Sequence, residues 1–170
     1  MPAGPAGGSG NVREDVPRMA PIPVKPGKYK IHAHIIGPTS LLTATEYAVK
    51  HGAPVITDRL NPLPIEQEWV IDAAEQEVPG SPYVIHLAYH PAAGLVVHED
   101  KLYVNSVPRA EWTKFTFERV IGGLKILGAD NGLALRAGHR GAQITLVKPQ
   151  PEFQETWTLE YLGPIPAEEE

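Results

Sequence analysis

Short runs of alternating apolar and polar residues recur along the chain, and an aromatic residue heads three of them. These runs are Trp69-Val70-Ile71, Phe115-Thr116-Phe117 and Trp157-Thr158-Leu159. Their aromatic positions lie 46 and 42 residues apart (115 − 69 and 157 − 115). Alternation of this kind predicts strands, and a spacing that stays near one value predicts three structural repeats.

Each third of the chain holds three further apolar pulses before its aromatic strand. The first pulses are 27–31, 81–85 and 123–126, the second are 41–43, 94–97 and 132–135, and the third are 54–57, 102–104 and 143–146. Four strands in each third give twelve. The pattern therefore predicts an all-β protein, and specifically a β-trefoil, in which six strands form a barrel and six form capping hairpins that leave no long edge exposed.

The two ends of the chain differ from this pattern. Residues 1–26 carry prolines at positions 2, 5, 17, 21, 23 and 26 and show no strand or helix periodicity, which predicts a flexible, disordered tail. The β-trefoil domain is expected over residues 27–162. Residues 163–170 end in three glutamates and are expected to form a frayed acidic tail. The 170 residues, 42% of them hydrophobic, suit one such domain.

Composition narrows the class of function. The formal net charge is −5 and no block of Lys and Arg is present, which argues against nucleic acid as a partner. The absence of cysteine excludes a disulfide framework and is compatible with the cytoplasm. No apolar run approaches the roughly 20 residues of a membrane helix, and residues 1–10 lack the hydrophobic centre of a signal peptide. We therefore expect a cytoplasmic monomer that binds neither nucleic acid nor membrane.

Chemistry-bearing residues do not form a recognisable catalytic or metal motif. His32 and His34 share one strand face and His86 lies on the corresponding strand of the second third, but no third ligand is fixed by the pattern, so we expect no metal and no other cofactor. The available Ser, His and Asp residues lie in no nucleophile elbow, so we expect no enzyme activity. Trp69 and Trp157 recur at equivalent positions and are expected in the core.

One loop carries chemistry that points to a function. Lys50 stands between Val49 and His51, with small residues around them, and Pro54 stiffens the exit of the loop by fixing φ. A basic side chain on a loop held by strands at both ends suits an inhibitor that mimics a protease substrate. The side chain fits an acidic specificity pocket, and the scaffold has already met the ordering entropy. The plain alternative is an exposed lysine in a hairpin connection.

Six motifs together carry a family resemblance. They are Gly27-x-Tyr29-x-Ile31, Gln67-x-Trp69-Val70-Ile71, Tyr83-Val84-Ile85, Asp100-Lys101-Leu102-Tyr103-Val104-Asn105, Gly122-Gly123-Leu124-Lys125-Ile126 and Gln154-x-x-Trp157-x-Leu159. With these motifs the chain resembles the fungal (mushroom) β-trefoil serine protease inhibitors, which are related in fold to the mycocypins, over about residues 27–162. The resemblance implies substrate-like inhibition of trypsin-like proteases through the loop between the second and third strands. Val49, Lys50 and His51 are assigned as its reactive site from loop placement and chemistry.

Other loops and other functions stay open. Arg109 and Arg140 offer basic side chains on other loops, and Phe153 offers one for an apolar pocket. A β-trefoil lectin would share the architecture but needs shallow polar pockets repeated on each unit, and the loops differ between units. The same scaffold also suits a cysteine protease inhibitor, or an adaptor that binds a protein partner through the barrel surface.

Overall fold

The computed structural model describes residues 21–34, 40–45, 52–60, 64–75 and 81–166, and the structural statements below concern these residues. They form twelve β-strands and three single-turn 3-10 helices. The strands are β2 (Gly27–Ala33), β3 (Ser40–Ala44), β4 (Ala53–Asp58), β5 (Trp69–Ala73), β6 (Tyr83–Leu87), β7 (His90–His98), β8 (Lys101–Asn105), β9 (Phe115–Val120), β10 (Gly123–Gly128), β11 (Ala134–Arg136), β12 (Thr145–Val147) and β13 (Trp157–Gly163). The helices are η1 (Pro64–Glu66), η2 (Arg109–Glu111) and η3 (Phe153–Glu155). No helix in this part of the chain is long and apolar enough to cross a membrane.

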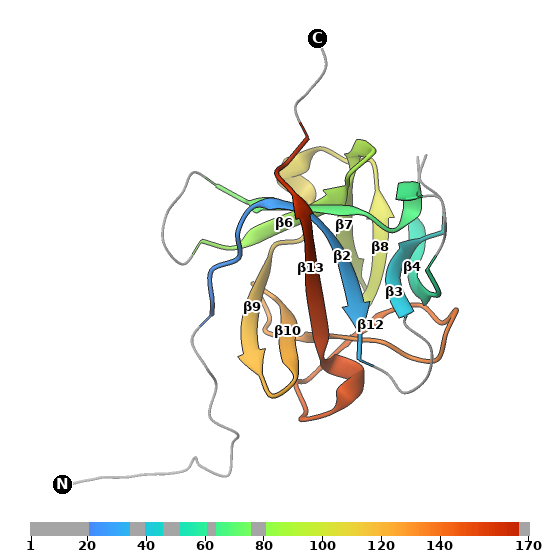
Figure 1. Ribbon diagram of the computed structural model, residues 1–170, viewed down its shortest axis with the longest axis vertical. Helices are drawn as coiled ribbons and strands as arrows, with labels where there is room; N and C mark the ends of the chain where they lie inside the picture. The colour runs from blue at the N-terminus through green and yellow to red at the C-terminus, as the bar shows by residue number, and fades with distance from the viewer. Residues whose placement is uncertain (1–20, 35–39, 46–51, 61–63, 76–80, 167–170) are drawn as a thin grey trace, which may run out of the picture.

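Six of the strands close a barrel. Strands β2, β5, β6, β9, β10 and β13 pair in that order, and β13 pairs back with β2. All of these pairs are antiparallel. The first and last strands of the described chain, β2 and β13, therefore lie side by side, as Figure 1 shows. A closed ring leaves none of its strands with an unpaired edge.

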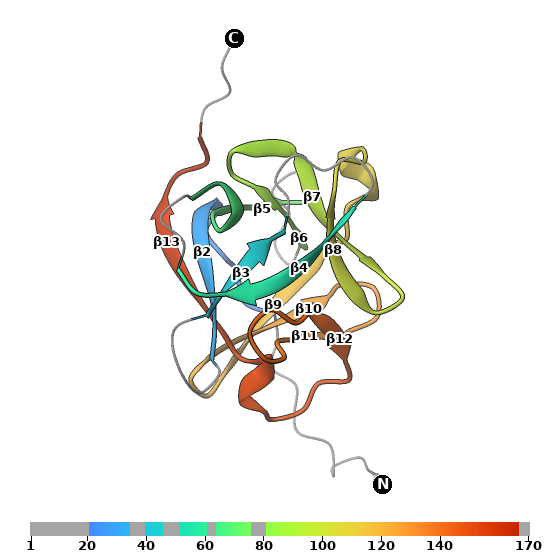
Figure 2. The ribbon, with the colours of Figure 1, turned by 90° about the vertical axis from the view of Figure 1, so that its right-hand side faces the viewer.

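The other six strands form three hairpins, β3 with β4, β7 with β8 and β11 with β12. Each hairpin joins the barrel through its first strand, which pairs with β2, β6 or β10. Strand β8 also pairs with both β4 and β12, so the hairpins meet one another (Figure 2). A six-strand ring with three hairpins is the arrangement of a β-trefoil, and the predicted all-β fold is confirmed.

The aromatic residues that mark the three repeats form the centre of the core. Trp69, Phe115 and Trp157 are fully buried at the starts of β5, β9 and β13. Both tryptophans predicted in the core therefore lie there. Trp112 is also buried, and its indole ring covers Gly94 so closely that a Cβ there would lie 2.2 Å from the ring. Glycine is thus required beneath Trp112.

In each unit, one main-chain carbonyl of the second strand accepts a hydrogen bond from the first residue of the fourth strand or from a residue just before that strand. In the first and third units the indole N–H groups donate to Leu42 at 3.0 Å and to Leu135 at 3.1 Å. The second unit has a phenylalanine, whose ring carries no N–H, and the backbone N–H of Thr113 donates to Leu95 at 3.0 Å instead. The three units thus satisfy the same carbonyl by two different donors.

Residues 21–26, which lie before the predicted domain start at Gly27, contact the barrel. The backbone N–H of Ile22 donates to the Phe117 carbonyl at 2.8 Å, and that of Val24 donates to the Tyr83 hydroxyl at 2.7 Å. Val24 is buried. The tail boundary at residue 26 is therefore corrected, because the apolar side chains between the prolines pack on the barrel. The rest of the predicted tail, 1–20, and residues 167–170 lie outside the described residues.

Thr57 occupies a hairpin position at which the other two units have an apolar residue. It lies opposite Leu42, as Val104 lies opposite Leu95 and Leu146 opposite Leu135. Its side chain is 0% exposed, and its Oγ1 has no hydrogen-bond partner. Thr57→Val should raise the free energy of unfolding by about 1–3 kcal/mol, because it removes an unsatisfied hydroxyl and keeps the shape. Urea denaturation of variant and wild type measures the difference.

Thr43→Val is the matched control for that substitution. The Thr43 hydroxyl is also buried, but it donates to the Leu41 carbonyl at 2.8 Å and accepts from the Gln67 amide at 3.1 Å. Its removal should lower stability, since Gln67 loses a partner. A stability loss in Thr57→Val as large as that in Thr43→Val would contradict the account.

Candidate functional site

The predicted reactive site falls in a gap between two described segments. Val49, Lys50 and His51 lie outside the described residues, which end at Thr45 and resume at Gly52. Their assignment stays a prediction. What the structure does describe is the pair of strands that leads into this loop and out of it.

Main-chain pairing fixes both ends of the loop. Ala44 lies opposite Val55 in the β3–β4 pair, and the hydroxyl of Thr45 donates to the Pro54 carbonyl at 2.9 Å. On its other side, β4 begins its pairing with β8 at Ala53. Both ends of the loop are therefore fixed by pairing with neighbouring strands. Fixed ends reduce the conformational entropy that is lost when the loop binds a partner.

Arg109, the first secondary candidate, is engaged within the protein. It begins η2, and its guanidinium donates to the Asp72 carboxylate at 3.2 Å and to the Ala73 carbonyl at 3.0 Å. The same group lies 5.7 Å from the centre of the Trp112 ring. These contacts tie the crossover between β8 and β9 to the end of β5. Arg109 would have to break them to enter an acidic pocket on a protease.

The other two secondary candidates have different surroundings. Arg140 is half-buried in the connection between β11 and β12, and its Nε atom is buried with no hydrogen-bond partner. Phe153 is 68% exposed and begins η3, in the connection between β12 and β13. The three candidates lie on three different connections, and in the described part of the chain no contact joins one candidate to another.

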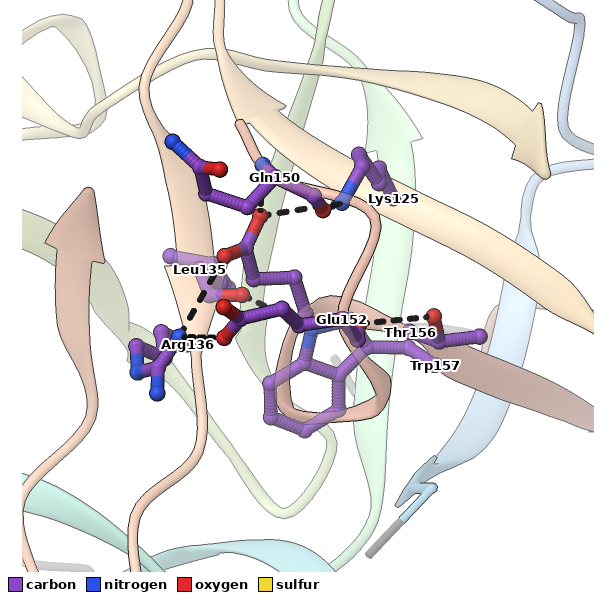
Figure 3. A network of polar contacts seen from close by, with 8 residues as sticks. Lys125, Leu135, Arg136, Gln150, Glu152, Thr156 and Trp157 are labelled. Carbon is purple, nitrogen blue, oxygen red and sulfur yellow. Dashed lines mark hydrogen bonds and ion pairs between the residues drawn. The ribbon is translucent and has the colours of Figure 1, made fainter. Parts of the chain in front are cut away.

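A buried carboxylate anchors the connection that carries Phe153. The Oε1 of Glu155 accepts hydrogen bonds from the Lys125 Nζ at 2.9 Å and from the backbone N–H of Gln150 at 2.7 Å. Its Oε2 lies 3.4 Å from the Arg136 Nη1, and Arg136 also donates to Glu152 (Figure 3). Glu155 is fully buried, and Lys125 is nearly so. Two strands and one loop are therefore joined by a network of paired charges.

Glu155 is the residue that the sequence motifs do not single out. It lies two residues before Trp157, as Gln67 lies two residues before Trp69. Gln67 is also buried and donates to a main-chain carbonyl of its own crossover at 2.7 Å. The motif that ends at Trp157 begins with Gln154, three residues before the aromatic, and passes over Glu155. Counting back from the aromatic residue identifies the equivalent position.

The histidines make pairwise contacts. The Nε2 of His32 lies 2.8 Å from the Glu160 Oε1, and the Nε2 of His34 lies 2.6 Å from the Thr158 Oγ1. The first contact joins β2 to β13, and the second joins the residue that follows β2 to β13. Within the described segments, no group of three or more His, Cys, Asp or Glu side chains is placed to hold a metal ion.

Solved structures with the same fold include a protease inhibitor and a lectin. The designed three-fold symmetric protein ThreeFoil matches with a TM-score of 0.66 at 19% identity, over 80% of this chain and 99% of that chain. The Rhizoctonia solani agglutinin matches with a TM-score of 0.65 at 12% identity, over 84% and 100%. A proteinase inhibitor from Coprinopsis cinerea matches with a TM-score of 0.62 at 15% identity, over 82% and 100%. No protein-family model and no curated protein sequence matches the chain. At these identities the likeness shows the β-trefoil fold.

His86 lies on β6 beneath Trp112, with ring centres 5.5 Å apart and its Nδ1 2.9 Å from the Leu87 carbonyl. Burial lowers the pKa of His86, by more than the Leu87 carbonyl raises it. The ordinary pKa of a histidine, which His86 has in the unfolded chain, is about 6.5, and in the folded chain the pKa is lower. Just below pH 6.5 the unfolded chain therefore binds more protons than the folded chain, so the free energy of unfolding falls as the pH drops through that value.

His86→Gln should flatten the slope of unfolding free energy between about pH 5 and 8. A slope in His86→Gln equal to that of the wild type would rule out this role.

Glu155→Gln should lower the free energy of unfolding by about 3–5 kcal/mol, because it leaves the Lys125 ammonium buried without a counter-charge. Combining it with Lys125→Met should recover part of the loss, since the uncompensated charge is then removed. Chemical denaturation of the two variants and wild type gives the comparison. A double variant less stable than Glu155→Gln alone would show that the buried charge is not the cause.

Proposed function

We propose that the protein is a non-catalytic inhibitor of trypsin-like serine proteases that binds through the loop of residues 46–51. The observation that carries the proposal is the fixed base of this loop, held by β3, β4 and β8. Binding costs less when the scaffold has already ordered the ends of a loop. Lys50 supplies the cation that an acidic specificity pocket requires, and the pocket-filling side chain sets the preference among proteases.

The comparison with known structures supports the proposal at the level of the scaffold. The Coprinopsis cinerea proteinase inhibitor has the same fold over its whole length. Folds host many functions, so this likeness makes an inhibitor plausible without identifying its loop. The loop chemistry and the β3–β4–β8 pairing are what favour inhibition through residues 46–51.

A carbohydrate-binding function is the second candidate, because the Rhizoctonia solani agglutinin also shares the fold. A sugar site repeated on each unit needs equivalent surface residues, and these differ here. Tyr89 is 49% exposed on the β6–β7 turn and contacts Lys28 and Glu68, whereas Asp130 follows β10 at the corresponding turn. The differences between units favour a function that depends on one loop.

Lys50→Glu should weaken trypsin inhibition by roughly 30-fold to several thousand-fold, because truncating a charge that is buried on binding commonly costs about 2–5 kcal/mol. Titration of trypsin activity with the full chain measures the inhibition constant. Thermal unfolding of the variant should match the wild type, because the proposal assigns Lys50 to protease contact and not to packing within the protein.

Arg140→Glu on the β11–β12 connection and Lys101→Glu at the start of β8 are the charge-matched controls, and both should inhibit trypsin as the wild type does. If Lys50→Glu inhibits at wild-type strength while Arg140→Glu does not, the inhibitory loop is the β11–β12 connection. If the wild type inhibits neither trypsin nor papain but binds immobilised glycans, the lectin function replaces the proposal.

A further inference from the structure

Phe153 is an exposed aromatic side chain at a sharp corner of the chain. Glu152 before it is extended, with φ −126° and ψ 148°, and the 3-10 helix η3 begins at Phe153 itself. The ring is 68% exposed. In both ribbon views this connection lies at the end of the molecule opposite the end of β13 (Figures 1 and 2). A large apolar side chain in such a place loses no internal packing when a partner covers it.

Hydrogen bonds fix the chain on both sides of this corner. Before it, the backbone N–H of Glu152 donates to the Gln150 carbonyl at 2.9 Å, and Gln150 is itself held by Glu155. After it, the backbone N–H of Thr156 donates to the Phe153 carbonyl at 3.0 Å. Two prolines, at positions 149 and 151, restrict φ in the approach. The loop is therefore preorganised, which reduces the entropy cost of docking.

The charges next to Phe153 are paired within the protein. Glu152 is bound by Arg136, and Glu155 is bound by Lys125 and Arg136. Burying charges costs free energy unless the charges pair with one another. Here the paired charges fix the position of the loop. No unpaired charge of this network is left to enter a pocket together with the ring. The surface therefore suits an apolar, uncharged pocket, unlike the acidic pocket that Lys50 suits.

We propose that Phe153 is a second protease-contacting residue, which docks into the apolar specificity pocket of a chymotrypsin-like serine protease. This inference rests on the proposed inhibitor function for the class of partner, but it uses a different loop. A few residues carry most of the binding energy of a protein interface, and a preorganised loop lowers the entropy cost of presenting one of them. Arg136, Lys125 and Glu155 are positioning residues for this loop and do not touch the partner.

The test is titration of chymotrypsin activity with the full-length protein and with three variants whose folding is checked by circular dichroism. Wild type should inhibit, and Phe153→Ala should weaken inhibition by about 30-fold or more, the effect of losing an interface anchor. Phe153→Leu should retain most of the inhibition. Leu60→Ala is the matched control, because Leu60 is 57% exposed on the corresponding crossover of the first unit. It should inhibit as the wild type does.

Lys50→Glu separates the two proposals. It should weaken trypsin inhibition by roughly 30-fold or more and leave chymotrypsin inhibition intact, because the two loops act independently. A wild type that inhibits trypsin but not chymotrypsin overturns the Phe153 proposal alone. Equal chymotrypsin inhibition by wild type and Phe153→Ala overturns it as well. A protein that inhibits chymotrypsin through Phe153 but does not inhibit trypsin leaves this inference standing and removes the Lys50 assignment.

Discussion

The pairing of β13 with β2 is the constraint on which the rest of the structure depends. It joins the last strand of the chain to the first and closes the ring, so that every barrel strand has a partner on both sides. Leu159 lies opposite Ile31 within this pair, and His32 and His34 add side-chain contacts across it. Without this pairing, β2 and β13 would each have an unpaired edge. The three hairpins pair with strands of the closed ring, so their positions also depend on it.

Because strand pairing alone closes the barrel, the connections between strands can differ in sequence from one unit to the next. Two positions before the aromatic residue that begins the fourth strand, the three units carry Gln67, Thr113 and Glu155. In each unit this side chain hydrogen-bonds to a main-chain group of a neighbouring segment. An amide, a hydroxyl and a carboxylate perform this task with different partners. The barrel can therefore keep one geometry while its surface connections carry different chemistry, as expected where function lies in loops on a rigid scaffold.

Periodicity and the three aromatic positions were enough to predict the barrel, because burial on one face of each strand leaves an alternating pattern in the sequence. The segment 21–26 was not recognised, since Ile22 and Val24 lie between prolines and show no periodicity of their own. The Glu155 network was also not predictable, because Lys125, Arg136 and Gln150 come from separate segments that only the fold brings together. The inhibitory loop remains a prediction from loop chemistry, as Val49, Lys50 and His51 lie outside the described residues.

The proposed function depends on a loop with a fixed base that presents Lys50 to a protease. The most direct measurement is a crystal structure of the full chain with trypsin, prepared at equimolar concentration and purified as a complex. The account predicts that residues 46–51 occupy the active-site cleft, with the Lys50 ammonium paired to the acidic group of the specificity pocket. A complex in which another connection fills the cleft, or the absence of any complex at equimolar concentration, would contradict it.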